Sequence, residues 1–221
     1  MTRKLKLPRK RLLTIHDRLY AAYGPQYWWP GDTPFEIMVG AVLTQNTAWI
    51  NVERAIANLK AADALDPEAI VDAPHERLAE WLRPSGYFNI KAECLRAFCI
   101  WYIEQGGFES LSGMETGDLR EALLAVKGIG PETADDMLLY AFERPVFVID
   151  AYTRRLFSRH GLITGDEPYD TLRLAIEAAL GPDVPLYNEY HALIVRHAKE
   201  ACRVKPACHG CPVRRGCRMP D

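Results

Sequence analysis

Four cysteines near the C-terminus have a spacing that suits a metal centre. They follow one another as C-x5-C-x2-C-x5-C, at Cys202, Cys208, Cys211 and Cys217. Cysteine thiolates bind zinc as well as iron–sulfur clusters. Zinc sites usually join two tight C-x2-4-C pairs, but here only Cys208 and Cys211 lie that close together. The longer outer arms therefore favour a 4Fe-4S cluster, with zinc as the alternative.

A second candidate site is the turn in the segment VKGIGPETADD. Gly128, Ile129 and Gly130 form its centre, and glycine allows the left-handed backbone that tight turns need. A helix that begins after this turn offers free N–H groups and the positive end of its dipole, which together can hold a phosphate. Lys127 adds a cation, while backbone donors read no base sequence and would only position a nucleic acid. A plain corner between two helices is the alternative interpretation.

Helical patterns that could position these sites run along almost the whole chain. Thr33-Pro34-Phe35-Glu36 has the form of a capping box, in which Thr33 caps a helix and Glu36 reaches back. Thr47 can cap the next helix, and the short β-branched segment PVFVID leads into another one. The periodicity predicts an all-α fold with helices at 11–23, 35–43, 50–59, 67–72, 76–82, 90–104, 118–126, 133–142, 150–159, 169–180 and 187–199.

The composition is that of a soluble globular protein. The chain has 221 residues, 48% apolar and 25% charged, which is enough for one large domain or two modest ones. It has no apolar run of about 18 residues, and its basic N-terminus lacks the apolar stretch of a secretory signal. We therefore expect a cytoplasmic protein, in which disulfides are rare. Cys94 and Cys99 stand among apolar neighbours and are expected in the core.

The charge is unevenly distributed along the sequence. The net charge is −2, but residues 1–11 hold six basic residues and no acidic one, so residues 12–221 carry −8. A basic segment can bind a polyanion locally even when the rest of the chain is acidic. A solvated tail explains the same pattern equally well, so charge alone does not identify a nucleic-acid partner.

Three of these segments together resemble the endonuclease III superfamily of DNA glycosylases, the helix-hairpin-helix enzymes with a Gly/Pro-rich loop and a downstream aspartate. They are LLAVKGIGPETAD, then VIDAYTRRLF, then the four-cysteine tail. LTQNTAWINVERA (43–55) and GYFNIKAE (86–93) resemble that family's DNA-probing segments, so the likeness runs from about residue 12 to 217. WWP at 28–30, with FEIMVGAVLTQNTAW, is more similar to the 3-methyladenine DNA glycosylase III branch, which does not uniformly carry the cluster.

The resemblance implies a two-lobed helix-hairpin-helix glycosylase fold. Residues 32–146 would form a six-helix lobe that contains the hairpin, and residues 1–31 with 147–221 would form the cluster lobe. The implied partner is double-stranded DNA with a damaged base, which is flipped out of the duplex into a cleft. We expect a monomer that makes no contact with a membrane.

The resemblance also assigns two catalytic carboxylates. Asp150 matches the family's active-site aspartate, which stabilises the sugar cation as the base departs and helps water attack C1′. Asp150 can also cap the helix that follows it. Glu132 occupies the position where bifunctional members carry a lysine that forms a Schiff base and cuts the strand. A carboxylate cannot form a Schiff base, so we expect a monofunctional glycosylase without efficient AP-lyase activity.

The expected base pocket is aromatic. Trp28, Trp29 and Trp49 match the branch's base-binding positions, and Pro30 belongs to the same motif. Tryptophan faces stack on flipped bases and attract cations, so this pocket with Glu132 suits a cationic alkylpurine such as 3-methyladenine. Alternatively, the tryptophans are ordinary core residues. Glu132 could likewise be a solvated residue at the start of a helix. Two alternative functions remain. The chain could excise mismatched, deaminated or oxidised bases, or it could bind DNA without catalysis.

The expected DNA contacts come from three turns. Gln45 matches the residue that fills the hole left by the flipped nucleotide, and Tyr87 matches the wedge beside the opposite base. The hairpin would hold a phosphate. Its expected contact residues are Lys127, Gly128, Ile129, Gly130 and Thr133.

Overall fold

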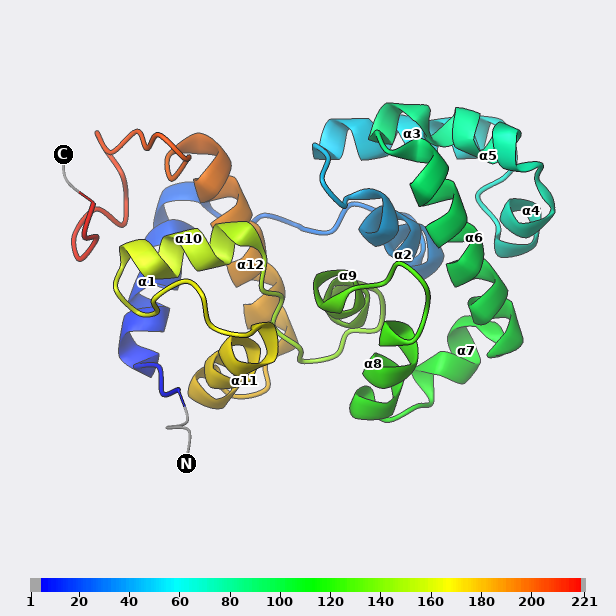
Figure 1. Cartoon of the computed structure of the whole chain (residues 1–221). Helices are drawn as coiled ribbons and strands as arrows, with labels where there is room; N and C mark the ends of the chain where they lie inside the picture. Colours follow the sequence, from blue (N-terminus) through cyan, green and yellow to red (C-terminus); the bar gives the residue numbers. More distant parts are fainter. Residues whose placement is uncertain (1–4, 220–221) are drawn as a thin grey trace. The chain divides into compact units, whose positions relative to one another are not determined.

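The computed structural model describes residues 5–219, in which all regular structure is helical (Figure 1). The all-α prediction is confirmed. The chain forms two compact units. The central unit comprises Trp29–Arg144, and the terminal unit comprises Met1–Trp28 together with Pro145–Asp221. The sequence predicts a central lobe over 32–146, and the central unit observed here spans Trp29–Arg144.

The described residues hold twelve α-helices. Those of the central unit are α2 (Pro34–Leu43), α3 (Trp49–Ala61), α4 (Pro67–Asp72), α5 (His75–Leu82), α6 (Phe88–Glu104), α7 (Gly107–Ser112), α8 (Thr116–Leu124) and α9 (Pro131–Asp136). This unit also has a short 3-10 helix (Arg83–Ser85) and a π-helical turn (Met137–Ala141). Those of the terminal unit are α1 (Arg9–Tyr23), α10 (Ala151–Arg159), α11 (Tyr169–Leu180) and α12 (Val184–Glu200).

Helix α2 is the buried centre of the central unit, because its sequence PFEIMVGAVL is apolar on nearly every side. It packs against α3, α6, α9 and the π-helical turn. Thr33 caps its start by accepting the N–H of Glu36, as predicted. The Glu36 carboxylate reaches back to the N–H of Asp32 rather than to that of Thr33, and it also pairs with Lys60.

Two details of the predicted helices are wrong. Thr47 does not cap α3, because Ala48 occupies the N-cap position and a methyl group cannot accept a hydrogen bond. Helix α7 has no counterpart in the sequence prediction, because it begins at Gly106 and Gly107. Both of these glycines have left-handed backbones, and two consecutive glycines are typical of a loop.

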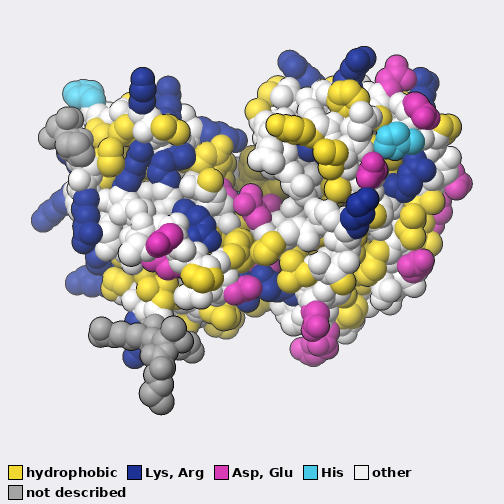
Figure 2. All heavy atoms as spheres, viewed as in Figure 1, with side chains coloured by type: hydrophobic (Ala, Val, Ile, Leu, Met, Phe, Trp, Pro, Cys, Tyr) yellow, Lys and Arg dark blue, Asp and Glu magenta, His cyan; other side chains and the backbone are white. Residues whose placement is uncertain are grey.

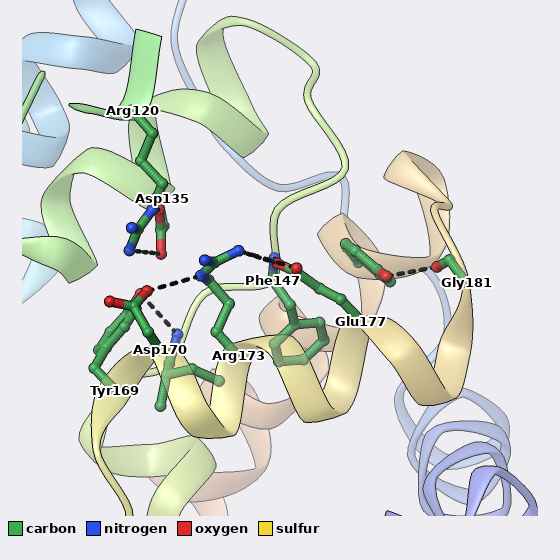
Figure 3. A network of polar contacts seen from close by, with 10 residues as sticks. Arg120, Asp135, Phe147, Tyr169, Asp170, Arg173, Glu177 and Gly181 are labelled. Carbon is green, nitrogen blue, oxygen red and sulfur yellow. Dashed lines mark hydrogen bonds and ion pairs between the residues drawn. The ribbon is translucent and has the colours of Figure 1, made fainter. Parts of the chain in front are cut away.

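Helices α8 and α9 form the predicted hairpin and are joined by a buried ion pair. The Arg120 guanidinium on α8 donates to both carboxylate oxygens of Asp135 on α9, at 2.6 and 3.2 Å (Figure 3). Asp135 is fully buried, and a two-pronged pair of this kind fixes the geometry of both partners. Beyond α9 the helix widens into the π-helical turn, where the sequence predicts a continuous α-helix.

The core of the terminal unit is aromatic. Tyr187 and Tyr190 on α12 both meet Phe147 edge-on, with ring centres 5.4 and 5.9 Å away. The Tyr190 hydroxyl donates to the carbonyl of Leu12 at 2.8 Å, which ties α1 to α12. The N-terminal helix and the C-terminal half of the chain therefore share one core.

The segment PVFVID crosses this core without regular secondary structure, and the described residues contain no β-strand to pair with it. The N–H of Phe147 donates to the Glu177 carboxylate at 3.0 Å (Figure 3). The N–H of Ile149 donates to the Tyr169 hydroxyl at 3.2 Å. Side chains of α11 thus satisfy backbone groups that a neighbouring strand would otherwise pair, and the segment delivers Asp150 to the start of α10.

Charge is divided sharply between the two units. The terminal unit has 18 Lys and Arg against 10 Asp and Glu, so its net charge is +8. The central unit has 9 against 19, which gives −10 and accounts for the total of −2. Figure 2 shows Lys and Arg side chains gathered on the terminal unit near the C-terminal loop. Among the described helices, none is long and apolar enough to cross a membrane.

Candidate active site and cysteine loop

Asp150 stands at the start of α10 and is buried. Its Oδ1 accepts the N–H of Thr153 at 2.6 Å, which confirms the predicted N-cap. Its Oδ2 lies 3.5 Å from Nε2 of His191 on α12. Burial by itself raises the pKa of this carboxyl, but the contacts with His191 and Thr153 outweigh burial and bring the pKa below its usual value. Asp150 is therefore ionised at neutral pH although it is buried.

The two glycines of the hairpin turn have different structural roles. Gly128 has a left-handed backbone, with φ of +88°, and an added Cβ would lie 2.2 Å from Sγ of Cys94 on α6. Gly130 has φ of −94°, which any residue adopts, and an added Cβ would meet no described heavy atom within 4 Å. The expected left-handed backbone is therefore needed at Gly128 alone. Gly130 instead leaves open space before α9, and Ile129 is buried.

The charged residues of the hairpin lie at the surface. Lys127 pairs with Glu93 of α6, with 3.0 Å between Nζ and Oε2, and both side chains are more than half exposed. An exposed pair of this kind contributes little to stability, so the ammonium can exchange Glu93 for a phosphate. Glu132 is exposed at the second position of α9, where a carboxylate suits the positive end of the helix dipole.

The two expected wedge residues lie in turns of the central unit. Gln45 follows α2, and its Nε2 donates to the Gly128 carbonyl at 3.1 Å and to Oγ1 of Thr133 at 3.0 Å. Thr133 is buried, and its hydroxyl accepts this hydrogen bond from Gln45. Tyr87 precedes α6, is 69% exposed and has a left-handed backbone. Gln45 is thus hydrogen-bonded directly to the hairpin, which the sequence does not indicate.

Two of the expected pocket tryptophans meet within the central unit. Trp29 and Trp49 contact each other edge to face, with ring centres 5.1 Å apart. Tyr140 lies 5.0 Å from Trp29, centre to centre. Gly40 of α2 allows this approach, because a Cβ there would lie 3.1 Å from the Trp29 indole nitrogen. These three rings form the aromatic cluster of the central unit.

The motif WWP is divided between the two units. Trp28 belongs to the terminal unit, where Nζ of Lys199 lies 5.9 Å from its ring centre, a cation–π distance. Pro30 is exposed in the central unit and lines a surface hollow together with Trp49, Glu36 and Glu53.

Sequence reasoning does not identify three residues that take part in these arrangements. Tyr140 lies in the π-helical turn and His191 in the middle of α12, and no motif surrounds either one. Gly40 does have a signal. A glycine within the apolar run PFEIMVGAVL lowers helix stability, and its presence indicates that something packs closely against it.

The four cysteines line one hollow of the terminal unit, together with His160 and His197. Helix α10 holds this loop through Arg159, whose guanidinium lies 3.2 Å from Sγ of Cys202 and donates to the carbonyls of Arg203 and Val204. Among the described residues, no three Cys, His, Asp or Glu side chains converge closely enough to hold a single metal ion. The four thiols nevertheless lie around one common hollow, as the ligands of a shared metal centre would.

Comparisons with known proteins agree with this geometry. Residues 39–182 match the family described as HhH-GPD superfamily base excision DNA repair protein. A protein of Methanocaldococcus jannaschii, provisionally named a DNA repair glycosylase, is 45% identical over 206 residues, which cover 92% of this chain and 94% of its own. Endonuclease III of Haemophilus influenzae is 28% identical over 86% of each chain.

Two solved structures are also similar. The 3-methyladenine DNA glycosylase of H. pylori, bound to 1,N6-ethenoadenine, is 33% identical with a TM-score of 0.72, over 87% of this chain and 95% of that one. Endonuclease III in a non-covalent DNA complex has a TM-score of 0.82 over 96% of each chain, at 20% identity, so that likeness concerns the fold. This chain therefore belongs to the HhH-GPD superfamily of base excision DNA repair proteins, and it is a DNA glycosylase.

Proposed function

We propose that this glycosylase is monofunctional and removes alkylated purines, such as 3-methyladenine, from double-stranded DNA. The observation that carries the proposal is the buried, ionised carboxylate of Asp150 in a chain that has Glu132 at the lysine position of bifunctional relatives. The similar H. pylori enzyme, named for 3-methyladenine and bound to an ethenoadenine, supports alkylated purines as the substrate class.

In this mechanism Asp150 acts while the bond between C1′ of the sugar and the base nitrogen breaks. The bonding electrons leave with the base, and the positive charge that develops on the sugar is stabilised by the fixed carboxylate. Water then adds to C1′ and loses a proton to solvent, because a carboxylate with a lowered pKa is a poor proton acceptor. A purine alkylated at N3 is cationic, so it departs as a neutral base and needs no proton from the enzyme.

Glu132 would add selectivity for such cationic bases. Its carboxylate attracts a positively charged purine and offers nothing comparable to neutral adenine. The aromatic cluster of Trp29, Trp49 and Tyr140 supplies ring faces, which attract cations as well. Both features favour a cationic substrate over a mismatched or deaminated base, which is neutral.

We propose that turns of the central unit bind the DNA. The open space at Gly130 and the exposed Lys127 suit a phosphate at the hairpin. Gln45 and Tyr87 would enter the duplex, and Thr133 would act through its hydrogen bond to Gln45.

We assign a 4Fe-4S cluster to Cys202, Cys208, Cys211 and Cys217, in preference to zinc. Their spread around one hollow and their resemblance to the endonuclease III loop support this choice. Burial raises the pKa of the Cys211 thiol, so a bound metal is what would hold it as a thiolate. The cluster would serve to fix the C-terminal loop, with the Arg159 guanidinium beside it to balance negative charge.

The substrate is tested on duplexes that carry 3-methyladenine, 7-methylguanine, hypoxanthine, uracil or an oxidised pyrimidine. We expect excision of the two alkylpurines, and a loss of about 100-fold or more in Asp150→Asn. Asparagine also caps helices well, so this variant should keep its fold. Preferred excision of uracil or hypoxanthine would overturn the alkylpurine assignment, and a strong borohydride-trapped adduct on abasic DNA would overturn monofunctionality.

Glu132→Gln tests the selectivity. We expect excision of 3-methyladenine to fall about tenfold, equivalent to about 1.4 kcal/mol, because the attraction to the cation is lost. Binding to a duplex with an abasic-site analogue should not change. Glu76→Gln is the matched control, since Glu76 is an exposed carboxylate at the second position of another helix of the central unit, α5. Equal excision by Glu132→Gln and the wild type would remove Glu132 from the site.

The two hairpin glycines separate folding from DNA binding. Gly128→Ala should lower the free energy of unfolding by about 2 kcal/mol or more, because the backbone is left-handed and the Cβ meets Cys94. Gly130→Ala should have the unfolding free energy of the wild type. It should bind duplex DNA about tenfold more weakly, because its methyl group occupies the space proposed for the phosphate. Thermal unfolding and fluorescence anisotropy measure the two effects. Unchanged DNA affinity in Gly130→Ala would refute a phosphate-binding site at the hairpin.

The metal is settled by elemental analysis of protein purified without oxygen. We expect about four iron and four sulfide per chain, and iron should be lost in Cys208→Ser. Cys99→Ser is the control, since Cys99 is a core residue of the central unit and should leave the iron content unchanged. One zinc per chain and no sulfide would show that the alternative is correct.

A further inference from the structure

A buried lysine joins two turns of the central unit. Lys91 lies on α6 and is only 4% exposed. Its ammonium donates to the carbonyl of Leu43 and to the carbonyl of Ser85, both at 2.7 Å. Burial lowers the pKa of Lys91 to about 8, because an enclosed ammonium loses hydration. Both hydrogen-bond acceptors are backbone atoms that are far apart in the sequence.

The two carbonyls stand at helix ends. Leu43 is the last residue of α2, and Ser85 is the last residue of the 3-10 helix. Carbonyls at such ends have no partner within their own helix, and an ammonium suits the negative end of the dipole. Gln45 follows Leu43 by two positions, and Tyr87 follows Ser85 by two positions. Lys91 therefore anchors the base of each turn that presents an expected wedge.

Other contacts extend this connection to the hairpin. Gln45 is hydrogen-bonded to the Gly128 carbonyl and to Thr133, so the first wedge turn is tied to α9. Tyr87 keeps a left-handed backbone, with φ of +46°, which a tyrosine adopts only when its surroundings hold it. On its N-terminal side, the Ser85 carbonyl that Lys91 binds lies two residues away.

We propose that Lys91 is a positioning residue that fixes the separation of the Gln45 and Tyr87 turns, so that both side chains enter the duplex together. This inference rests on the proposed wedge roles of Gln45 and Tyr87. An apolar side chain of the same length would fill the space but would leave two buried carbonyls to find other partners. The turns would then drift independently, and a displacement of about 1 Å can lower the rate of a positioned reaction by about 100-fold.

The test is Lys91→Met, which keeps the length of the side chain and removes its charge. The DNA probe is a duplex with a tetrahydrofuran abasic-site analogue beside a 2-aminopurine, whose fluorescence rises when wedge insertion unstacks it. We expect the insertion rate to fall about 10- to 100-fold, while the affinity for plain duplex changes less than about twofold. The control Lys60→Met removes an exposed lysine of the same unit and should leave insertion unchanged.

Further variants distinguish the two levels of the proposal. Gln45→Ala and Tyr87→Ala should each lower the 2-aminopurine signal, and Gln45→Ala should have a smaller effect in the Lys91→Met background because the variants share one pathway. A signal unchanged in both wedge variants would refute the wedge roles and the inference together. A signal lowered by the wedge variants but unchanged in Lys91→Met would refute only the role of Lys91. A loss in Lys91→Met that merely follows the unfolded fraction, measured by circular dichroism, would also refute it.

Discussion

The placement of the buried Asp150 carboxylate depends on backbone hydrogen bonds that helices cannot supply. The segment PVFVID runs without regular secondary structure through the aromatic core, where each buried N–H needs an acceptor. Glu177 accepts the N–H of Phe147, and Arg173 holds that carboxylate at 2.9 Å. The Tyr169 hydroxyl accepts the N–H of Ile149. These side chains fix the last residues before α10, and the cap on Thr153 then orients Asp150.

In the central unit the backbone groups that need partners are carbonyls rather than N–H groups. The turns that carry Gln45 and Tyr87 follow the ends of helices, where carbonyls lack partners. Lys91 donates to two such carbonyls, of Leu43 and Ser85, and Gln45 donates to the Gly128 carbonyl within the hairpin turn. Polar side chains in both units thus organise irregular backbone. That irregular backbone presents the residues assigned to catalysis and to DNA.

Most features set by neighbouring residues in the sequence, such as helices and their caps, were predicted correctly. Helical periodicity located eleven of the twelve α-helices in the described chain, and the caps at Thr33 and Asp150 followed from their neighbours. The need for a left-handed glycine was predictable at a turn, but the meeting of Gly128 with Cys94 was not. His191 beside Asp150 and Gln45 on the hairpin join residues distant in sequence. A single sequence has no periodicity or motif that reports such pairs.

The unequal charge of the two units bears on how this enzyme searches DNA. The hairpin that would hold a phosphate belongs to a unit of net charge −10, so phosphate binding there must come from short-range contacts with N–H donors and Lys127. Long-range attraction to a polyanion falls instead to the terminal unit, at +8. Mobile ions weaken long-range attraction far more than hydrogen bonds at contact. We therefore expect ionic strength to govern how often the protein meets DNA, and much less how it inspects a base once it has arrived.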